Sequence, residues 1–130
     1  MTIDVETQNK RQVLDISDEV QKHLPAGDGL VNIFVKHTTC AITTADLDPG
    51  TDEDFLDFLK AITPNPPASG WRHPHDPQHA PDHLLSSIIG PEVSVPYIGG
   101  KLQLGSWQRV ILVELDGPRT REIELNFLKS

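Results

Sequence analysis

Histidines are concentrated in one part of this sequence, since four of the six lie between Trp71 and Ser87. An imidazole ring can ligate a metal ion, carry a proton near neutral pH, or exchange hydrogen bonds with a polar substrate. The simpler alternative is a solvated polar loop, in which the histidines have no chemical task. Both interpretations stay open on this stretch alone. The four residues are His73, His75, His79 and His83.

A metal site can be assembled from histidines of several segments. His73 and His75 stand two positions apart, His79 and His83 stand four apart, and His37 would come from a predicted strand. Zinc is the natural cation for such ligands, and three histidines with one water form a common catalytic arrangement. A proline between His79 and His83 interrupts their pairing on a helix. The spacing alone therefore leaves the ligand set open.

Two nucleophilic alternatives have less support. A hydrolase based on either serine of residues 86–87 needs a strained Gly-x-Ser-x-Gly turn, which this sequence lacks. Asp82 adjoins His83, so the two would point in different directions on a helix. Cys40 follows His37 by three residues, and on a flat strand their side chains face opposite sides. Cys40 is therefore expected to be a small buried residue.

The charge balance limits the class of partner. Lysine and arginine number 11 and aspartate and glutamate 19, which gives a net charge of -8. Nucleic acids and anionic membranes reward clustered basic residues, so neither is expected as a partner. A local basic pocket is compatible with this balance, because Arg109, Arg119 and Arg121 lie near one another and can hold a phosphate or a carboxylate. Pairing of these arginines with neighbouring acids is the alternative.

Length and cysteine content indicate one domain in a reducing compartment. A chain of 130 residues is expected to fold as one domain, residues 1–130, around one core. Its single cysteine excludes an intramolecular disulfide. The first residues show no signal-peptide pattern, and no apolar run reaches membrane-spanning length. We therefore expect a soluble cytoplasmic protein.

The first third of the chain predicts short strands and one helix. Residues 2–7 and 12–16 have strand periodicity and predict an opening hairpin. Ser17 is a suitable N-cap for a short amphipathic helix that ends at a proline. Residues 30–36 predict a strand, and the parity of His37 places its ring on the buried side if the strand stays straight.

A second helix is predicted after a turn at residues 46–50. Thr51 and Asp54 resemble a capping box, and the five apolar residues that follow on one face are assigned to the core. The proline-rich residues 63–70 predict an ordered loop or a lid. A short helix over 81–89 then places His83 near a helix N-terminus, which favours the neutral imidazole. The five apolar residues are Phe55, Leu56, Phe58, Leu59 and Ile62.

The last third is rich in β-structure. Residues 93–97, 102–115 and 122–128 predict an antiparallel meander, with apolar side chains of the last strand facing inward and its acidic and amide side chains outward. Two opening strands, helices between strands and a closing meander indicate the α+β class. The predicted fold is a compact single domain, mainly an antiparallel β-sheet or sandwich, with two to three short helices.

Four separated motifs resemble the YjbQ family, also catalogued as UPF0047 and as secondary thiamine-phosphate synthase. They span nearly the whole chain in the family's order, which makes the resemblance specific. It implies a compact α+β fold with an antiparallel β-sandwich, assembled as a homotrimer with pockets at the subunit boundaries. The motifs are His37 to Thr43 (HTTCAIT), His79 to Pro91 (HAPDHLLSSIIGP), Gly100 to Gln108 (GKLQLGSWQ) and Glu114 to Arg119 (ELDGPR).

The resemblance also implies which residues form the site. The implied metal ligands are His37, His73 and His83. The implied catalytic residues are His37, His83, Ser87 and Glu114, and the implied ligand-binding residues are Trp107, Gln108 and Arg119.

This sequence departs from the family pattern at several positions. His79 stands where the family usually has asparagine, and Asp82 where it has alanine. The turn after Thr44 keeps only Asp48 and Pro49 of a longer polar motif. These departures concern the identity of the substrate more than the fold, and they leave His75 and His79 without an assigned role.

The activity implied by the resemblance is that of a thiamine-phosphate synthase, which joins a pyrimidine diphosphate to a thiazole phosphate. This reaction needs phosphate binding and normally a divalent cation. Zinc suits the histidines, and magnesium or manganese suits phosphoryl chemistry. We expect a small enzyme-like protein with a histidine-lined, metal-competent pocket for a small, phosphorylated ligand, and only weak synthase activity, because the chain is acidic and lacks a phosphate loop. The alternatives are a non-catalytic module that binds a metal or small ligand, and an interaction scaffold.

Overall fold

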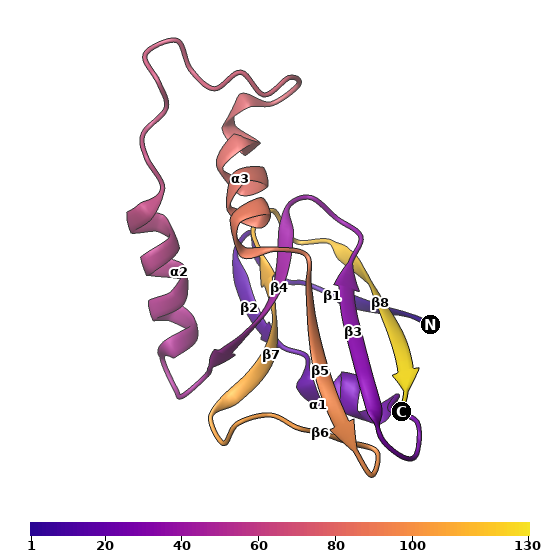
Figure 1. The fold of residues 1–130 in the computed structure, drawn as a ribbon. Coiled ribbons are helices and arrows are strands. Elements are labelled where there is room, and N and C mark those ends of the chain that lie inside the picture. Colours follow the sequence, from indigo (N-terminus) through magenta and orange to yellow (C-terminus); the bar gives the residue numbers. More distant parts are fainter.

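Two antiparallel sheets and three helices form the protein in the computed structural model, which describes all of residues 1–130 (Figure 1). The helices are α1 (Ser17–Lys22), α2 (Thr51–Ile62) and α3 (Ala80–Ile89), and a single 3-10 turn, Pro77–His79, precedes α3. The strands are β1 (Thr2–Glu6), β2 (Gln12–Asp15), β3 (Gly29–Val35), β4 (Cys40–Asp46), β5 (Glu92–Ile98), β6 (Lys101–Leu102), β7 (Gln108–Glu114) and β8 (Thr120–Lys129).

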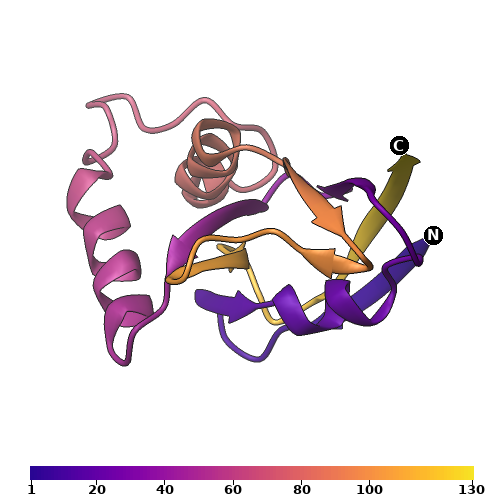
Figure 2. The same ribbon diagram turned by 60° about the horizontal axis from the view of Figure 1, so that its bottom comes forward.

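The strands are divided between two packed sheets. The larger sheet has the order β1-β8-β3-β5-β6, and the smaller has the order β2-β7-β4. Every strand pair is antiparallel. Helices α2 and α3 stand on the outer side of the smaller sheet (Figure 2). The predicted α+β class with a mainly antiparallel sandwich is therefore confirmed.

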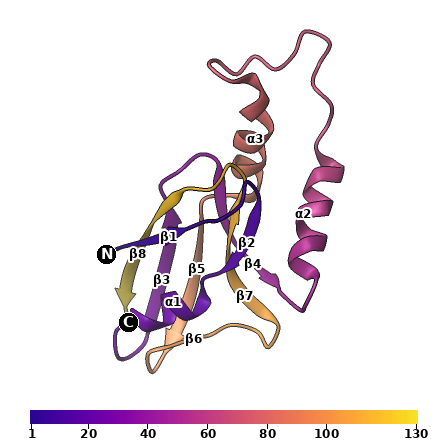
Figure 3. The ribbon, with the colours of Figure 1, turned by 180° about the vertical axis from the view of Figure 1, so that it is seen from behind.

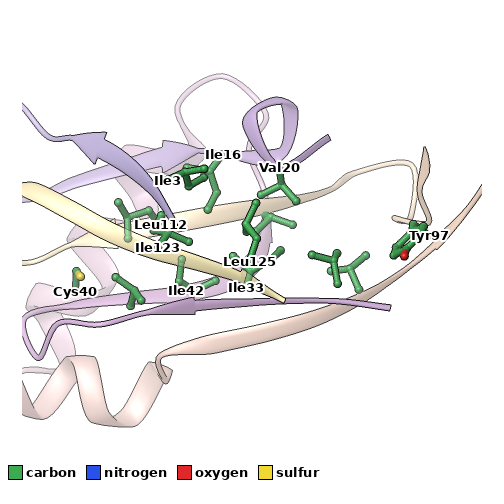
Figure 4. Close-up of a cluster of buried hydrophobic side chains, with 14 residues drawn as sticks. Ile3, Ile16, Val20, Ile33, Cys40, Ile42, Tyr97, Leu112, Ile123 and Leu125 are labelled. Carbon is green, nitrogen blue, oxygen red and sulfur yellow. The ribbon is translucent and has the colours of Figure 1, made fainter. Parts of the chain in front are cut away.

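The main core lies between the two sheets. Apolar residues of β3, such as Ile33, pack with Ile42 of β4 and Leu112 of β7 in one cluster of 14 buried residues (Figure 4). Cys40 belongs to this cluster and is fully buried. Burial raises the pKa of its thiol to about 12, so the thiolate is not populated at neutral pH. The prediction of a small buried cysteine is confirmed.

Strand β7 is buried on both of its faces, which explains its uninterrupted apolar run. Val110 and Leu112 belong to the core between the sheets. Ile111 and Val113 point the other way, into a second cluster that includes Leu85 of α3. Burying a side chain of this size stabilises the fold by about 2 kcal/mol. The second cluster therefore fixes α3, and with it the histidine that α3 bears, against the smaller sheet.

The apolar stripe of α2 is only partly core, which corrects the prediction. Leu59 is buried, and Phe55 packs partly buried against the second cluster. Phe58 and Ile62, however, are 67% and 53% exposed. Helix α2 lies beside the smaller sheet with no further layer over its outer side (Figure 2), so only part of an apolar stripe finds a partner within this chain.

The predicted opening hairpin and closing meander are both wrong. β1 pairs with β8 of the larger sheet, whereas β2 pairs with β7 of the smaller one. The run over residues 102–115 is divided into the short β6 and the long β7, which belong to different sheets. Successive strands pair only as a tendency, and in a sandwich a connection can pass from one sheet to the other. Local periodicity contains no information about that choice.

Two predicted helix caps are also wrong. Ser17 is the first residue of α1, and its hydroxyl instead accepts a hydrogen bond from the backbone N–H of Val110, at 2.8 Å. Thr51 is the first residue of α2, and Gly50 occupies the cap position with a φ of 90°. This left-handed conformation suits glycine, which has no Cβ to clash.

Candidate functional site

Two adjoining cavities share the side chains of His37 and His83. We call the first, of about 350 Å³, the arginine cavity, and the second, of about 470 Å³, the serine cavity. A larger cavity of about 630 Å³ lies beside α2 and its following loop, but none of the histidines lines it. The arginine cavity is lined by Lys36, His37, Thr38, Thr39, His79, His83, Asp116, Arg119 and Arg121. The serine cavity is lined by His37, Thr38, His83, Ser86, Ser87 and Pro91.

Three separate elements bring these residues together at one end of the sandwich. His37 and Thr38 belong to the connection between β3 and β4, His83 belongs to α3, and Arg119 precedes β8. The β3–β4 connection and the N-terminal part of α3 lie toward the same end of the molecule in Figure 1. The predicted meeting of His37 with His83 is therefore found in the structure.

His37 is held in one orientation by the backbone. β3 ends at Val35, so the ring lies beyond the strand and is partly buried, and its Nε2 accepts the N–H of Glu122 at 2.9 Å. Burial, followed by the charge of Arg121, lowers the pKa of His37, which favours the neutral ring. A neutral ring that accepts at Nε2 has its proton on Nδ1. His37 is thus arranged as a hydrogen-bond donor through Nδ1, and its Nε2 is already occupied.

The ring of His83 lies against that of His73. The two ring centroids are 4.5 Å apart with an angle of 44° between the planes. His73 comes from the loop before α3 and does not line either of the two cavities. No group of three or more histidine, cysteine, aspartate or glutamate side chains is close enough together to hold a metal ion. Of the three implied metal ligands, His37 and His83 thus line the same two cavities, and His73 contacts His83 from outside them.

Glu114 does not face either cavity, where a catalytic acid would lie. It is fully buried and lines neither cavity. Its carboxylate accepts hydrogen bonds from the guanidinium of Arg121, from the hydroxyl of Thr7 at 2.6 Å, and from the N–H of Leu115 at 3.0 Å. Burial raises the pKa of Glu114, but the bonds from Arg121 and Thr7 outweigh it, so the pKa lies below its ordinary value. The structure thus places Glu114 outside both cavities, among buried hydrogen-bond partners, and its catalytic role stays a prediction.

Arg121 connects this buried carboxylate to the wall of the arginine cavity. Its guanidinium donates to the hydroxyl of Thr39 at 2.9 Å and to the carbonyl oxygen of the same residue at 3.2 Å. Thr39 lies in the β3–β4 connection, two residues after His37. The buried pair of Glu114 and Arg121 therefore holds the connection from which His37 reaches the cavity.

The implied ligand-binding residues are divided between the two ends of β7. Arg119 is half-exposed in the arginine cavity, where its Nη2 lies 3.0 Å from Asp116. Gln108 begins β7 and Trp107 precedes it, with its side chain 70% exposed. The seven residues of β7 span roughly 20 Å. The end of β7 that continues from β6 lies away from the N-terminal part of α3 (Figure 3). A single chain does not bring Trp107 and Arg119 to one ligand.

Comparison with known proteins agrees with this combination of fold and motifs. The family described as "UPF0047 protein YjbQ-like" matches residues 1–130. The chain belongs to the YjbQ family. It is 36% identical over 123 residues to a UPF0047 protein of Archaeoglobus fulgidus, and the alignment covers 95% of this chain and 96% of the relative. It is 38% identical over 132 residues to a UPF0047 protein of Mycobacterium tuberculosis, which covers 98% of this chain and 96% of the relative.

Solved structures of related sequence have the same fold. A hypothetical protein from Aeropyrum pernix superposes with a TM-score of 0.89 at 35% identity and covers 100% of this chain and 98% of its own. A protein of unknown function from Sulfolobus solfataricus superposes with a TM-score of 0.86 at 36% identity and covers 100% of this chain and 96% of its own. No helix of the present chain has the length and apolar character needed to cross a bilayer.

Two of the departures from the YjbQ pattern, Asp82 and His79, join a charged network that the sequence did not predict. Lys10, from the connection between β1 and β2, donates to Asp82 at 2.6 Å and to Asp116 at 2.8 Å. Arg11 adds a second bond to Asp82 at 3.0 Å. His79 lies 3.6 Å from Asp116. The side chains of Asp82 and Asp116 are nearly buried, at 4% and 9% exposed. Because Lys10 bonds to both carboxylates, it links α3 to the turn before Arg119. The sequence signalled this network only through these two departures from the family pattern, Asp82 and His79.

Replacing Lys10 with methionine is expected to lower the free energy of unfolding by about 2 kcal/mol, because two nearly buried carboxylates lose a shared charged donor. The loss stays moderate since Lys10 itself is half-exposed and Arg11 and Arg119 remain as partners. Urea denaturation at pH 7 measures the change. Lys22→Met, which removes an exposed pair with Glu19, is the matched control and should cost less than about 1 kcal/mol. Equal costs for the two variants would contradict the linking role of Lys10.

Proposed function

We propose that the arginine cavity binds the phosphate group of a small phosphorylated molecule. The observation that supports this most is the charge of its wall: Lys36, Arg119 and Arg121 face a cavity that has one carboxylate, Asp116, and no apolar lining residue. Arg121 is neutralised by the buried Glu114. Lys36 lies 3.3 Å from Glu124, and Arg119 lies 3.0 Å from Asp116, so a bound phosphate would share these two cations with the carboxylates. Arginine and lysine donors recognise phosphate oxygens by charge-assisted hydrogen bonds.

The histidines provide groups for proton transfer at this phosphate. His37 offers the Nδ1 proton described above, and His83 lines both cavities beside it. We propose a small cytoplasmic enzyme in which His37 donates a hydrogen bond to the bound phosphate and His83 exchanges a proton with the ligand. General acid–base catalysis by such a residue contributes typically about 10²–10⁴-fold.

Thiamine-phosphate synthesis is the reaction that we propose for a weak activity of this site. The nitrogen of a thiazole phosphate attacks the methylene carbon of a pyrimidine diphosphate, the new C–N bond forms, and the C–O bond breaks to release pyrophosphate. A bound divalent cation would supply positive charge to that leaving group. Lys36 and Arg119 would hold the phosphates in place, with zinc, magnesium or manganese as the candidate cations.

A homotrimer would explain why the implied binding residues are divided. Trp107 and Gln108 belong to the site only if a neighbouring copy places its β6–β7 connection beside the arginine cavity of this one. The exposure of Trp107 on an otherwise acidic chain supports such a contact. We therefore propose that three copies assemble with the site at their boundaries. Small-angle scattering should give the mass of a trimer, and the mass of a monomer would contradict this assembly.

A non-catalytic metal-binding or small-ligand module is the second candidate. The close approach of His73 and His83 favours it, because two adjacent imidazoles can share one cation. Its ligand set would then exclude Nε2 of His37, which the N–H of Glu122 occupies.

Replacement of Arg119 by glutamine tests the phosphate proposal. Calorimetric titration with inorganic phosphate and with pyrophosphate should detect binding to the natural protein, and we expect the variant to bind roughly tenfold more weakly because a charge-assisted bond is lost. Arg109→Gln is the matched control, since Arg109 pairs with Asp15 and Asp18 away from both cavities. Equal weakening by both substitutions, or no binding of either anion to the natural protein, would contradict the proposal.

A further inference from the structure

The serine cavity extends the phosphate site and indicates what the rest of the ligand is. We infer that the ligand is a phosphate monoester whose remaining part is small, uncharged and rich in hydroxyl groups. This inference rests on the proposed phosphate site. The two cavities share His37, Thr38 and His83 as common walls. One molecule can therefore place its phosphate in the arginine cavity and its body in the serine cavity.

The serine cavity has no permanently charged residue in its lining. Lysine, arginine, aspartate and glutamate are all absent from its lining. A ligand carboxylate would have no cation there, and a ligand ammonium would have no acid, so either would lose its hydration without compensation. The part of the ligand in this cavity is therefore uncharged.

The two serine hydroxyls of the serine cavity are arranged as acceptors toward a ligand. The hydroxyl of Ser87 donates to the carbonyl oxygen of His83 at 3.0 Å, and that of Ser86 donates to the carbonyl oxygen of Cys40 at 2.6 Å. Each hydroxyl proton is thus used within the chain, and the exposed Ser87 oxygen keeps its lone pairs for a ligand donor. A hydroxyl group of the ligand is the neutral donor that matches it.

The residue types in the lining favour a polyol over an aromatic ring as the body of the ligand. Pro91 is the only residue of the serine cavity with a hydrocarbon side chain, and no phenylalanine, tyrosine or tryptophan lines either cavity. An aromatic body would therefore find only histidine rings to stack on, which agrees with proposing thiamine-phosphate synthesis, whose substrates are aromatic, as no more than a weak activity. The cavity volumes of about 350 and 470 Å³ suit a small ligand.

Calorimetric titration with three probes tests this inference. They are inorganic phosphate, glycerol 3-phosphate as the hydroxylated monoester, and phenyl phosphate as an aromatic monoester. We expect glycerol 3-phosphate to bind at least fivefold more tightly than inorganic phosphate, the factor that one net hydrogen bond of about 1 kcal/mol represents. Phenyl phosphate should gain no such advantage over inorganic phosphate.

Two substitutions locate the contact with the hydroxyl groups. Ser87→Ala should reduce the preference for glycerol 3-phosphate over inorganic phosphate by about fivefold. Ser106→Ala, at an exposed serine outside both cavities, is the matched control and should leave that preference unchanged. Thr38→Val, which removes a hydroxyl shared by both cavities, gives a second variant that preserves side-chain shape.

The outcomes separate this inference from the proposal on which it rests. If inorganic phosphate does not bind at all, the phosphate site itself is contradicted. If inorganic phosphate binds but glycerol 3-phosphate binds no more tightly, the phosphate site stands and the hydroxylated ligand is contradicted. Tighter binding of phenyl phosphate than of glycerol 3-phosphate would also overturn the inference, since the body of the ligand would then be aromatic.

Discussion

Replacing Arg121 with methionine is expected to lower the free energy of unfolding by about 3 to 5 kcal/mol, because it leaves a buried carboxylate without a cation. Arg121 is 1% exposed and Glu114 is 0% exposed. The guanidinium holds Glu114 and also the hydroxyl of Thr39, so the substitution breaks several buried hydrogen bonds at once. Urea denaturation at pH 7, followed by circular dichroism, measures the loss.

Two further variants show whether the loss comes from the buried charge. Arg109→Met removes an arginine that pairs with the exposed Asp15 and Asp18, and it should cost no more than about 1 kcal/mol. Combining Arg121→Met with Glu114→Leu should recover much of the lost stability, since no charge then stays buried. A cost of Arg121→Met that is no larger than that of Arg109→Met would contradict the expectation.

The same variant should reverse the response of stability to acid. In the natural protein the pKa of Glu114 is depressed, so its contribution is present above the unfolded pKa of about 4.3 and is lost as the pH falls through the folded pKa. Without Arg121, burial, which is the largest influence on this carboxyl, outweighs the remaining bonds from Thr7 and the backbone and raises the pKa of Glu114. The variant should then be less stable at pH 7 than at pH 5, whereas the natural protein should not. Denaturation curves at the two pH values make the comparison.

His83→Ala and His37→Ala are each expected to lower any turnover at the proposed site by about 10²–10⁴-fold, because each removes a group that exchanges a proton or a hydrogen bond with the ligand. Formation of thiamine phosphate from the pyrimidine diphosphate and the thiazole phosphate is the reaction to measure first. His75→Asn is the matched control: His75 is exposed, lines neither cavity, and has a φ of 69° that asparagine tolerates. Turnover that is unchanged in both alanine variants would contradict their catalytic role.

Metal analysis of the same variants separates the three classes of function. Loss of bound metal in His83→Ala without loss of turnover would favour the binding module. Changed assembly or partner binding with unchanged ligand binding would favour an interaction scaffold. If the natural protein binds no metal after zinc or manganese is supplied, metal binding is contradicted for both the enzyme and the module.

The sequence predicted the local elements and the family well, for a physical reason. The alternation in β8 places Ile123 and Leu125 in the core as expected, and the strand that leads to His37 lies close to its predicted range. Periodicity reports which face of an element is buried, and this depends on residues close in sequence. The four motifs, from His37 to Arg119, likewise identified the family.

Only the tertiary structure decided which strands pair and which residues share a site. Nothing local distinguishes β8 from β2 as the partner of β1, and nothing local places Trp107 at the far end of β7 from Arg119. The surroundings of Asp82 also depended on a distant cation, since Lys10 and Asp82 are 72 positions apart, and Glu114 meets Arg121 only because folding buries both. A carboxylate in a sequence can be solvated, catalytic or neutralised. The choice among these follows from the burial and the charges that folding brings around it.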